Sequence, residues 1–161
     1  MRRTAVDDLN AMEDAPPVSC CAGTSTSACV FGKALLSRTL SCELAARRTR
    51  GEQEVLECTS PVARINCDTL AALLHERSRF ALRLPGPGRP LMHQQAMRLQ
   101  CGGLTAMREL LGVAERDVHR LVAAAHERHA SLTELPWEPL VAAIAAWTPR
   151  RRAASQARSG R

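Results

Sequence analysis

The sequence predicts an all-α fold: a single compact domain of about five or six helices, with a flexible N-terminal leader and a basic, disordered C-terminal tail. Apolar residues recur at three- and four-residue steps, and no alternating strand pattern of useful length occurs. Aromatic residues make up 2% of the 161 residues, and Tyr is absent. The core must therefore be built from Leu, Ala, Val, Ile and Met, which suits helix packing.

Composition divides the chain into three parts. Residues 1–30 form the expected leader, because Pro16-Pro17 breaks any helix and the stretch from Cys20 to Cys29 is small and polar. Residues 31–148 form the expected helical domain. Residues 149–161 hold five Arg and no acid, so most of the formal net charge of +6 lies in this tail. A segment of that composition cannot bury itself and is expected to be disordered.

The domain is expected to begin with a helix over 33–48, where Leu residues recur at three- and four-residue steps. Gly51 is expected to end this helix, because Gly tolerates the conformation of a helix C-terminus. Residues 52–57 are compatible with a continuation of the helix after the break. The sequence therefore assigns this whole stretch to helices.

A second predicted helix begins with Ser60 as its N-cap and Pro61 at its first position, and it extends to about Leu82. Its expected apolar face consists of Val62, Ile65, Thr69, Leu70, Leu73, Leu74, Phe80 and Ala81. Residues 85–90, which alternate Pro and Gly, predict a loop. Further helices are expected over 91–100, 104–111, 113–130 and 140–147. The Cys101-Gly102-Gly103 sequence is expected to stop the first of these four.

The seven cysteines are the main chemical feature of the chain. Cys20, Cys21 and Cys29 lie in the expected leader, where ordering a mobile segment would oppose ligand binding. Four others lie in the expected helical domain: Cys42, Cys58, Cys67 and Cys101. We take these four as the candidate ligands of one tetrahedral metal site. Successive members of this set have 15, 8 and 33 residues between them, so no Cys-x2-Cys pair occurs. Buried thiols without metal are therefore the competing interpretation.

If the four sulfurs share a site, a [4Fe–4S] cluster is favoured, with zinc as the second choice. Ligands on separate helices with long spacings suit a bulky cluster better than a compact ion. Several arginines near the cysteines would offset the negative charge of such a cluster: Arg38, Arg47, Arg48, Arg64 and Arg98.

The sequence therefore predicts a small cytoplasmic helical protein with a four-cysteine metal or iron–sulfur site. Its expected role is electron transfer, redox sensing or an accessory function in a redox system, together with a protein partner. No apolar stretch is long enough to span a membrane. No His-Glu-x-x-His, Walker A, Gly-x-Gly-x-x-Gly or Gly-x-Ser-x-Gly motif occurs, so an enzyme with its own catalytic residues is the least supported class.

The alternative function is a metal-free helical interaction module. Such a module would bind a protein or nucleic acid through apolar grooves and through the tail residues Arg150, Arg151, Arg152 and Arg158. Nucleic acid is the weaker of these two partners, because exposed aromatics for base stacking are scarce.

Overall fold

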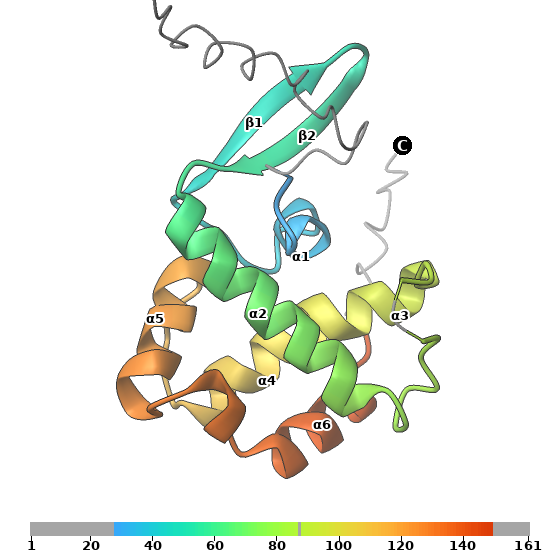
Figure 1. Ribbon diagram of the computed structural model, residues 1–161, viewed down its shortest axis with the longest axis vertical. Helices are drawn as coiled ribbons and strands as arrows, with labels where there is room; N and C mark the ends of the chain where they lie inside the picture. Colours follow the sequence, from blue (N-terminus) through green and yellow to red (C-terminus); the bar gives the residue numbers. More distant parts are fainter. Residues whose placement is uncertain (1–27, 87, 150–161) are drawn as a thin grey trace, which may run out of the picture.

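The computed structural model describes residues 28–86 and 88–149 and shows a mixed α/β fold (Figure 1). A two-stranded antiparallel sheet extends away from a group of helices, so the all-α prediction is wrong. The elements are α1 (Gly32–Leu36), β1 (Ala45–Arg50), β2 (Gln53–Cys58), α2 (Pro61–Ser78), α3 (His93–Met97), the π-helix η1 (Arg98–Gly102), α4 (Gly103–Leu110), α5 (Val118–Arg128), the 3-10 helix η2 (Leu132–Glu134) and α6 (Trp137–Ala146).

Only the beginning of the helix expected over 33–48 forms, as part of α1; a loop follows, and the β1–β2 hairpin replaces the end of that helix and its continuation over 52–57. Arg50 pairs with Gln53, so only two residues form the turn. The first of them, Gly51, has φ of +60°, as a type II′ hairpin turn requires. The Ala, Arg and Glu residues of this stretch are good helix formers, but intrinsic propensity amounts to less than about 1 kcal/mol per residue, and strand pairing outweighs it here.

Helix α2 begins where the sequence predicts. Ser60 caps it by accepting a hydrogen bond from the Ala63 amide (3.3 Å), and Pro61 is its first residue. The predicted apolar face is only partly buried: Val62, Ile65 and Phe80 are 71%, 65% and 89% exposed. Val62 and Ile65 lie in the first turns of α2, and Phe80 follows the end of the helix.

The predicted stop at Cys101-Gly102-Gly103 is absent, because α3, η1 and α4 follow one another without a break. Gly102 and Gly103 have helical φ values of −65° and −60°. A Cβ atom on Gly103 would lie 2.9 Å from a methyl group of Leu74, and one on Gly102 would lie 3.0 Å from the Trp147 side chain. The two glycines therefore allow close packing and do not end the helix.

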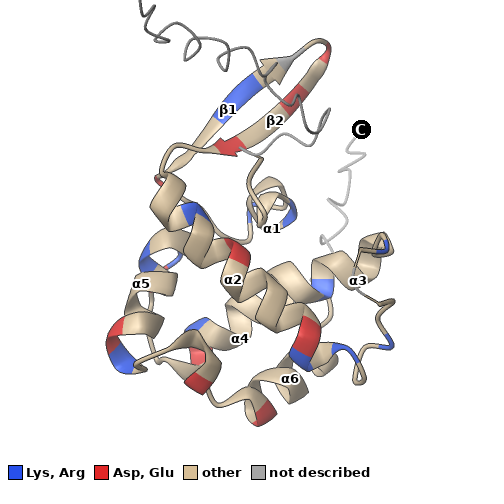
Figure 2. Ribbon diagram, viewed as in Figure 1, with Lys and Arg blue, Asp and Glu red and all other residues tan. Residues whose placement is uncertain are grey.

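The helical core lies between the second half of α2 and helices α4, α5 and α6 (Figure 1). Its largest fully buried side chains in these elements are Leu70, Leu74, Leu104, Met107, Leu121, Leu140 and Ile144. Within the described residues, none of the helices is both long and apolar enough to cross a membrane. Basic and acidic residues are interspersed over the helices, and β1 carries basic residues beside acidic ones on β2 (Figure 2).

Candidate metal centre

Four cysteine thiols lie around one small cavity at the base of the hairpin. Cys29, Cys42, Cys58 and Cys67 all line this cavity, whose volume is about 20 Å³. Each comes from a different segment: the chain before α1, the loop after α1, the end of β2 and the second turn of α2. We call these four residues the four-thiol site.

Cys29 and Cys58 are brought together by strand pairing. The Cys29 amide donates a hydrogen bond to the Leu56 carbonyl (2.7 Å), and Ala28 forms an isolated bridge with Glu57. Cys58 is the last residue of β2. The short 28–29 segment therefore lies against β2 and places both sulfurs at the same end of the hairpin.

The loop that carries Cys42 is held against the start of α5. The Ser41 amide donates to the Arg116 carbonyl (3.0 Å), and the Val118 amide donates to the Ser41 carbonyl (2.8 Å). One carboxylate oxygen of Asp117 accepts from the Glu43 amide (2.5 Å), while the other caps α5 by accepting from the Arg120 amide (3.1 Å). These bonds fix the backbone on both sides of Cys42.

Cys67 and Arg64 reach the cavity from α2. They lie three residues apart and therefore share one helix face. Arg64 donates from Nε to Asp68 at 3.3 Å, whereas its Nη1 atom is buried without a hydrogen-bond partner in the described part of the chain. A buried guanidinium nitrogen without a partner is unusual, so a negatively charged group beside it would be stabilised.

Burial dominates the electrostatics of the thiols. Burial first, and then the neighbouring thiols Cys29, Cys42 and Cys58, raise the pKa of Cys67 to about 12. Burial also raises the pKa of Cys29 and of Cys42, and a backbone hydrogen bond opposes the rise at each. A reactive catalytic cysteine needs a lowered pKa, so these three thiols lack the character of an enzymatic nucleophile.

The structure brings three of the four predicted ligands together and separates the fourth. Cys42, Cys58 and Cys67 belong to the four-thiol site, whereas Cys101 is fully buried within η1, where its sulfur lies 3.5 Å from the Ser37 hydroxyl. Cys29 stands in its place. The signal in the sequence for Cys29 is its position at the end of the expected leader, two residues before the helical domain that is predicted to begin at residue 31.

Of the arginines expected near the cysteines, Arg64 lines the four-thiol site. Arg38 and Arg47 line a neighbouring cavity instead. His119, to which sequence reasoning assigned no role, also lines the four-thiol site. Cys20, Cys21 and the tail arginines at 150, 151, 152 and 158 lie outside the described residues.

The four thiols share a cavity without forming a ready-made site for a single ion. Among the residues that the structure describes, no three His, Cys, Asp or Glu side chains are arranged to hold a metal ion. Comparisons of the chain with known protein families, curated proteins and solved structures find no match.

Proposed function

We propose that Cys29, Cys42, Cys58 and Cys67 together bind a [4Fe–4S] cluster, and that the protein transfers electrons or senses redox state. The observation that supports this proposal is the gathering of four thiols from four segments around one cavity. Isolated buried cysteines are common, but they have no reason to converge from separate elements. Four thiolates are the ligand set that a [4Fe–4S] cluster requires.

A cluster and a zinc ion require different separations between the four sulfur atoms. Four thiolates on one zinc ion at 2.3 Å must lie about 3.8 Å from one another, which is the geometry of a compact single-ion site. No such site is formed by the described residues. A four-iron cluster holds its sulfur ligands farther apart, at about 7 Å. Because the present cavity is only about 20 Å³, cluster binding requires the segments of Cys29 and Cys42, which lie outside helices, to move outward at the expense of some of the hydrogen bonds that hold them.

The charge of the surroundings also fits the proposal. A [4Fe–4S] core with four thiolates carries a net charge of about −2 in its oxidised state. The buried Nη1 of Arg64 would lie beside this charge and gain the partner that it lacks. The proposal thus accounts for two otherwise unexplained features, the converging thiols and the unpartnered guanidinium.

The hairpin gives a structural reason for a metal centre in this position. A two-stranded sheet by itself is only marginally stable in water. The four-thiol site joins the end of β2 to α2, to the loop after α1 and to the chain before α1. A bound cluster would therefore cross-link the hairpin to the rest of the fold.

The ligand set also indicates the kind of chemistry. Four cysteines complete the coordination of all four irons, so no iron is left open for a substrate. Besides the structural role described above, such a cluster can exchange one electron between its 2+ and 1+ states, and this exchange is the chemistry that we propose. We therefore expect a redox protein as the partner that supplies or accepts this electron.

Anaerobic purification tests the proposal directly. We expect a brown protein with broad absorption near 400 nm and about four iron and four sulfide per chain. Cys67→Ser and Cys29→Ser should each lose most of this iron. The control is Cys101→Ala, which removes a buried thiol outside the site and should keep the iron.

Two results would contradict the proposal of a [4Fe–4S] cluster. A colourless protein with one zinc per chain that is lost in Cys67→Ser would establish a zinc site. A folded, metal-free protein would establish the interaction module. Circular dichroism on each variant shows whether loss of iron reflects loss of a ligand or loss of the fold.

A further inference from the structure

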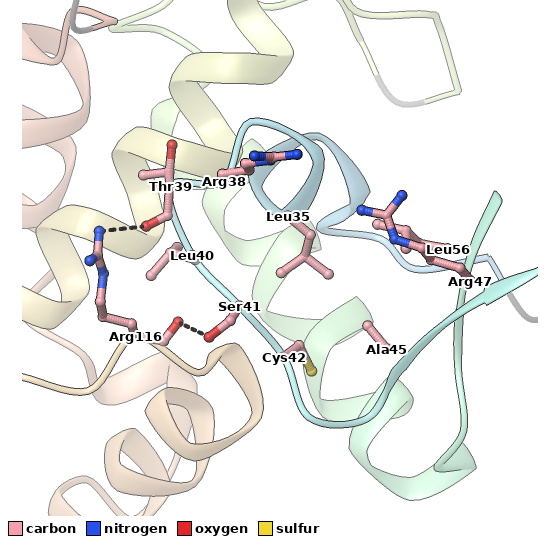
Figure 3. Close-up of a pocket in the computed structure, with 10 residues that line it drawn as sticks. All are labelled: Leu35, Arg38, Thr39, Leu40, Ser41, Cys42, Ala45, Arg47, Leu56 and Arg116. Carbon is pink, nitrogen blue, oxygen red and sulfur yellow. Dashed lines mark hydrogen bonds between the residues drawn. The ribbon is translucent and has the colours of Figure 1, made fainter. Parts of the chain in front are cut away.

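A second, larger cavity lies on the other side of the Cys42 loop. It has a volume of about 390 Å³ and lies between α1, the loop that follows it and the hairpin (Figure 3). Small-molecule sites in proteins have volumes of about 300–1,000 Å³, so this cavity is large enough for a small organic ligand. We call it the arginine cavity, because Arg38, Arg47 and Arg116 line it.

The charge of the arginine cavity is of one sign. Its lining includes those three guanidinium groups and no Asp or Glu. Arg47 pairs with Glu54 at the rim (2.9 Å), and Arg116 donates to the Thr39 carbonyl (3.4 Å). Arg38 has neither an ion pair nor a side-chain hydrogen bond with any described residue, so its guanidinium is available to a ligand.

The rest of the lining combines apolar side chains with the hydroxyl groups of Thr39 and Ser41. Leu35, Leu40 and Leu56 contribute their side chains, and Leu35 lies between Arg38 and Arg47 (Figure 3). A ligand that fills this space would place an apolar group against the leucines and an anionic group against the arginines. Guanidinium groups match phosphate oxygens in both geometry and charge.

We infer that the arginine cavity binds a small phosphate ester with an apolar or aromatic body. A concave site with three leucines in its lining suits a small molecule better than a nucleic-acid backbone, which contacts raised basic surfaces along its length. The inference does not depend on the metal centre, although Cys42 lines both cavities and would connect them.

Phenyl phosphate is the probe for this inference, and binding to the full chain is measured by isothermal titration calorimetry. We expect saturable binding of one phenyl phosphate per chain, tighter than that of inorganic phosphate or benzyl alcohol. Arg38→Gln should weaken binding about tenfold, because it removes a charged hydrogen-bond donor. Arg89→Gln is the matched control, because Arg89 is exposed and lies outside the cavity, and it should change binding less than twofold.

A second variant separates the two halves of the site. Leu35→Ala should weaken phenyl phosphate and leave inorganic phosphate unchanged, since it removes only apolar contact. Equal weakening by Arg38→Gln and Arg89→Gln would overturn the inference, because it would reveal non-specific charge attraction. Tighter binding of benzoate, or binding of duplex DNA in the absence of phenyl phosphate binding, would also overturn it.

Discussion

The two halves of α2 lie in different surroundings. In its first turns Val62 and Ile65 are 71% and 65% exposed, and the buried side of these turns faces the four-thiol site. In its second half Leu70 and Leu74 are 0% and 2% exposed and pack in the helical core. One helix therefore connects a region with little apolar burial to a region that is well packed.

The difference shows what must hold each region together. The helical core buries large aliphatic side chains, and burial of that kind stabilises by about 1.5–3 kcal/mol for each side chain. The hairpin lacks such a core, and its base is held by backbone hydrogen bonds and by residues around the four thiols. A metal centre would supply to the hairpin region what apolar packing supplies to the helices.

If the four-thiol site binds the proposed cluster, removal of that cluster should have the largest effect and should affect only one region. When iron is removed from the purified protein with an oxidant and a chelator, we expect amide hydrogen exchange in β1 and β2 to accelerate at least about a hundredfold. Exchange in α4 and α6 should change little, because neither helix contributes a residue to the lining of the four-thiol site. Hydrogen exchange followed by mass spectrometry measures both regions at once. An equal acceleration in both would contradict the idea that the hairpin depends on the metal and the helical core does not.

Gly103→Ala should destabilise the helical core and leave the metal site intact. The new methyl group would lie 2.9 Å from Leu74, so packing must shift, and we expect a loss of about 1–3 kcal/mol in the free energy of unfolding. Gly32→Ala is the control, because no atom lies within 4 Å of the added Cβ. Urea denaturation compares the two variants, and an equal response would remove the close-packing explanation.

The start of α2 and the pair Gly102 and Gly103 show what sequence patterns can and cannot predict about this fold. Ser60 and Pro61 signal the start of α2 through local chemistry, and the structure confirms it. Gly102 and Gly103 resemble a helix stop locally, but the contacts with Leu74 and Trp147 that explain them are distant in sequence. The hairpin was missed although its pairing is local, because Gly51 was interpreted as a helix end, whereas Gly at this position is also the signal of a type II′ hairpin turn.

The sequence predicted that the candidate site consists of thiols, but it did not predict which four cysteines form it. Cysteine count and the absence of other motifs pointed to a thiol site. Spacing alone could not separate Cys101, which is buried in the helical run, from Cys29, which pairs against β2. Only the strand contact between Cys29 and Leu56 decides which of the two joins the other three.

Asp117→Ala should weaken both regions moderately, because Asp117 connects them. It caps α5 and also accepts the Glu43 amide beside Cys42. We expect a loss of about 1–2 kcal/mol in the free energy of unfolding and about a tenfold faster loss of iron to a chelator. Asp117→Asn keeps one acceptor oxygen and should give an intermediate loss. Unchanged iron release in Asp117→Ala would show that the Cys42 loop does not depend on this carboxylate.

Two serines of α2 provide the finest test, because the same substitution should have opposite signs at the two ends of one helix. Ser78 is fully buried, and its hydroxyl has no hydrogen-bond partner in the described part of the chain. Ser78→Ala removes this unpaired polar group and should raise the free energy of unfolding by about 0.5–1 kcal/mol. Ser60→Ala removes the N-cap and should lower it by about 1 kcal/mol. Thermal denaturation resolves both changes, and a loss of stability in Ser78→Ala would mean that its hydroxyl has a partner in solution.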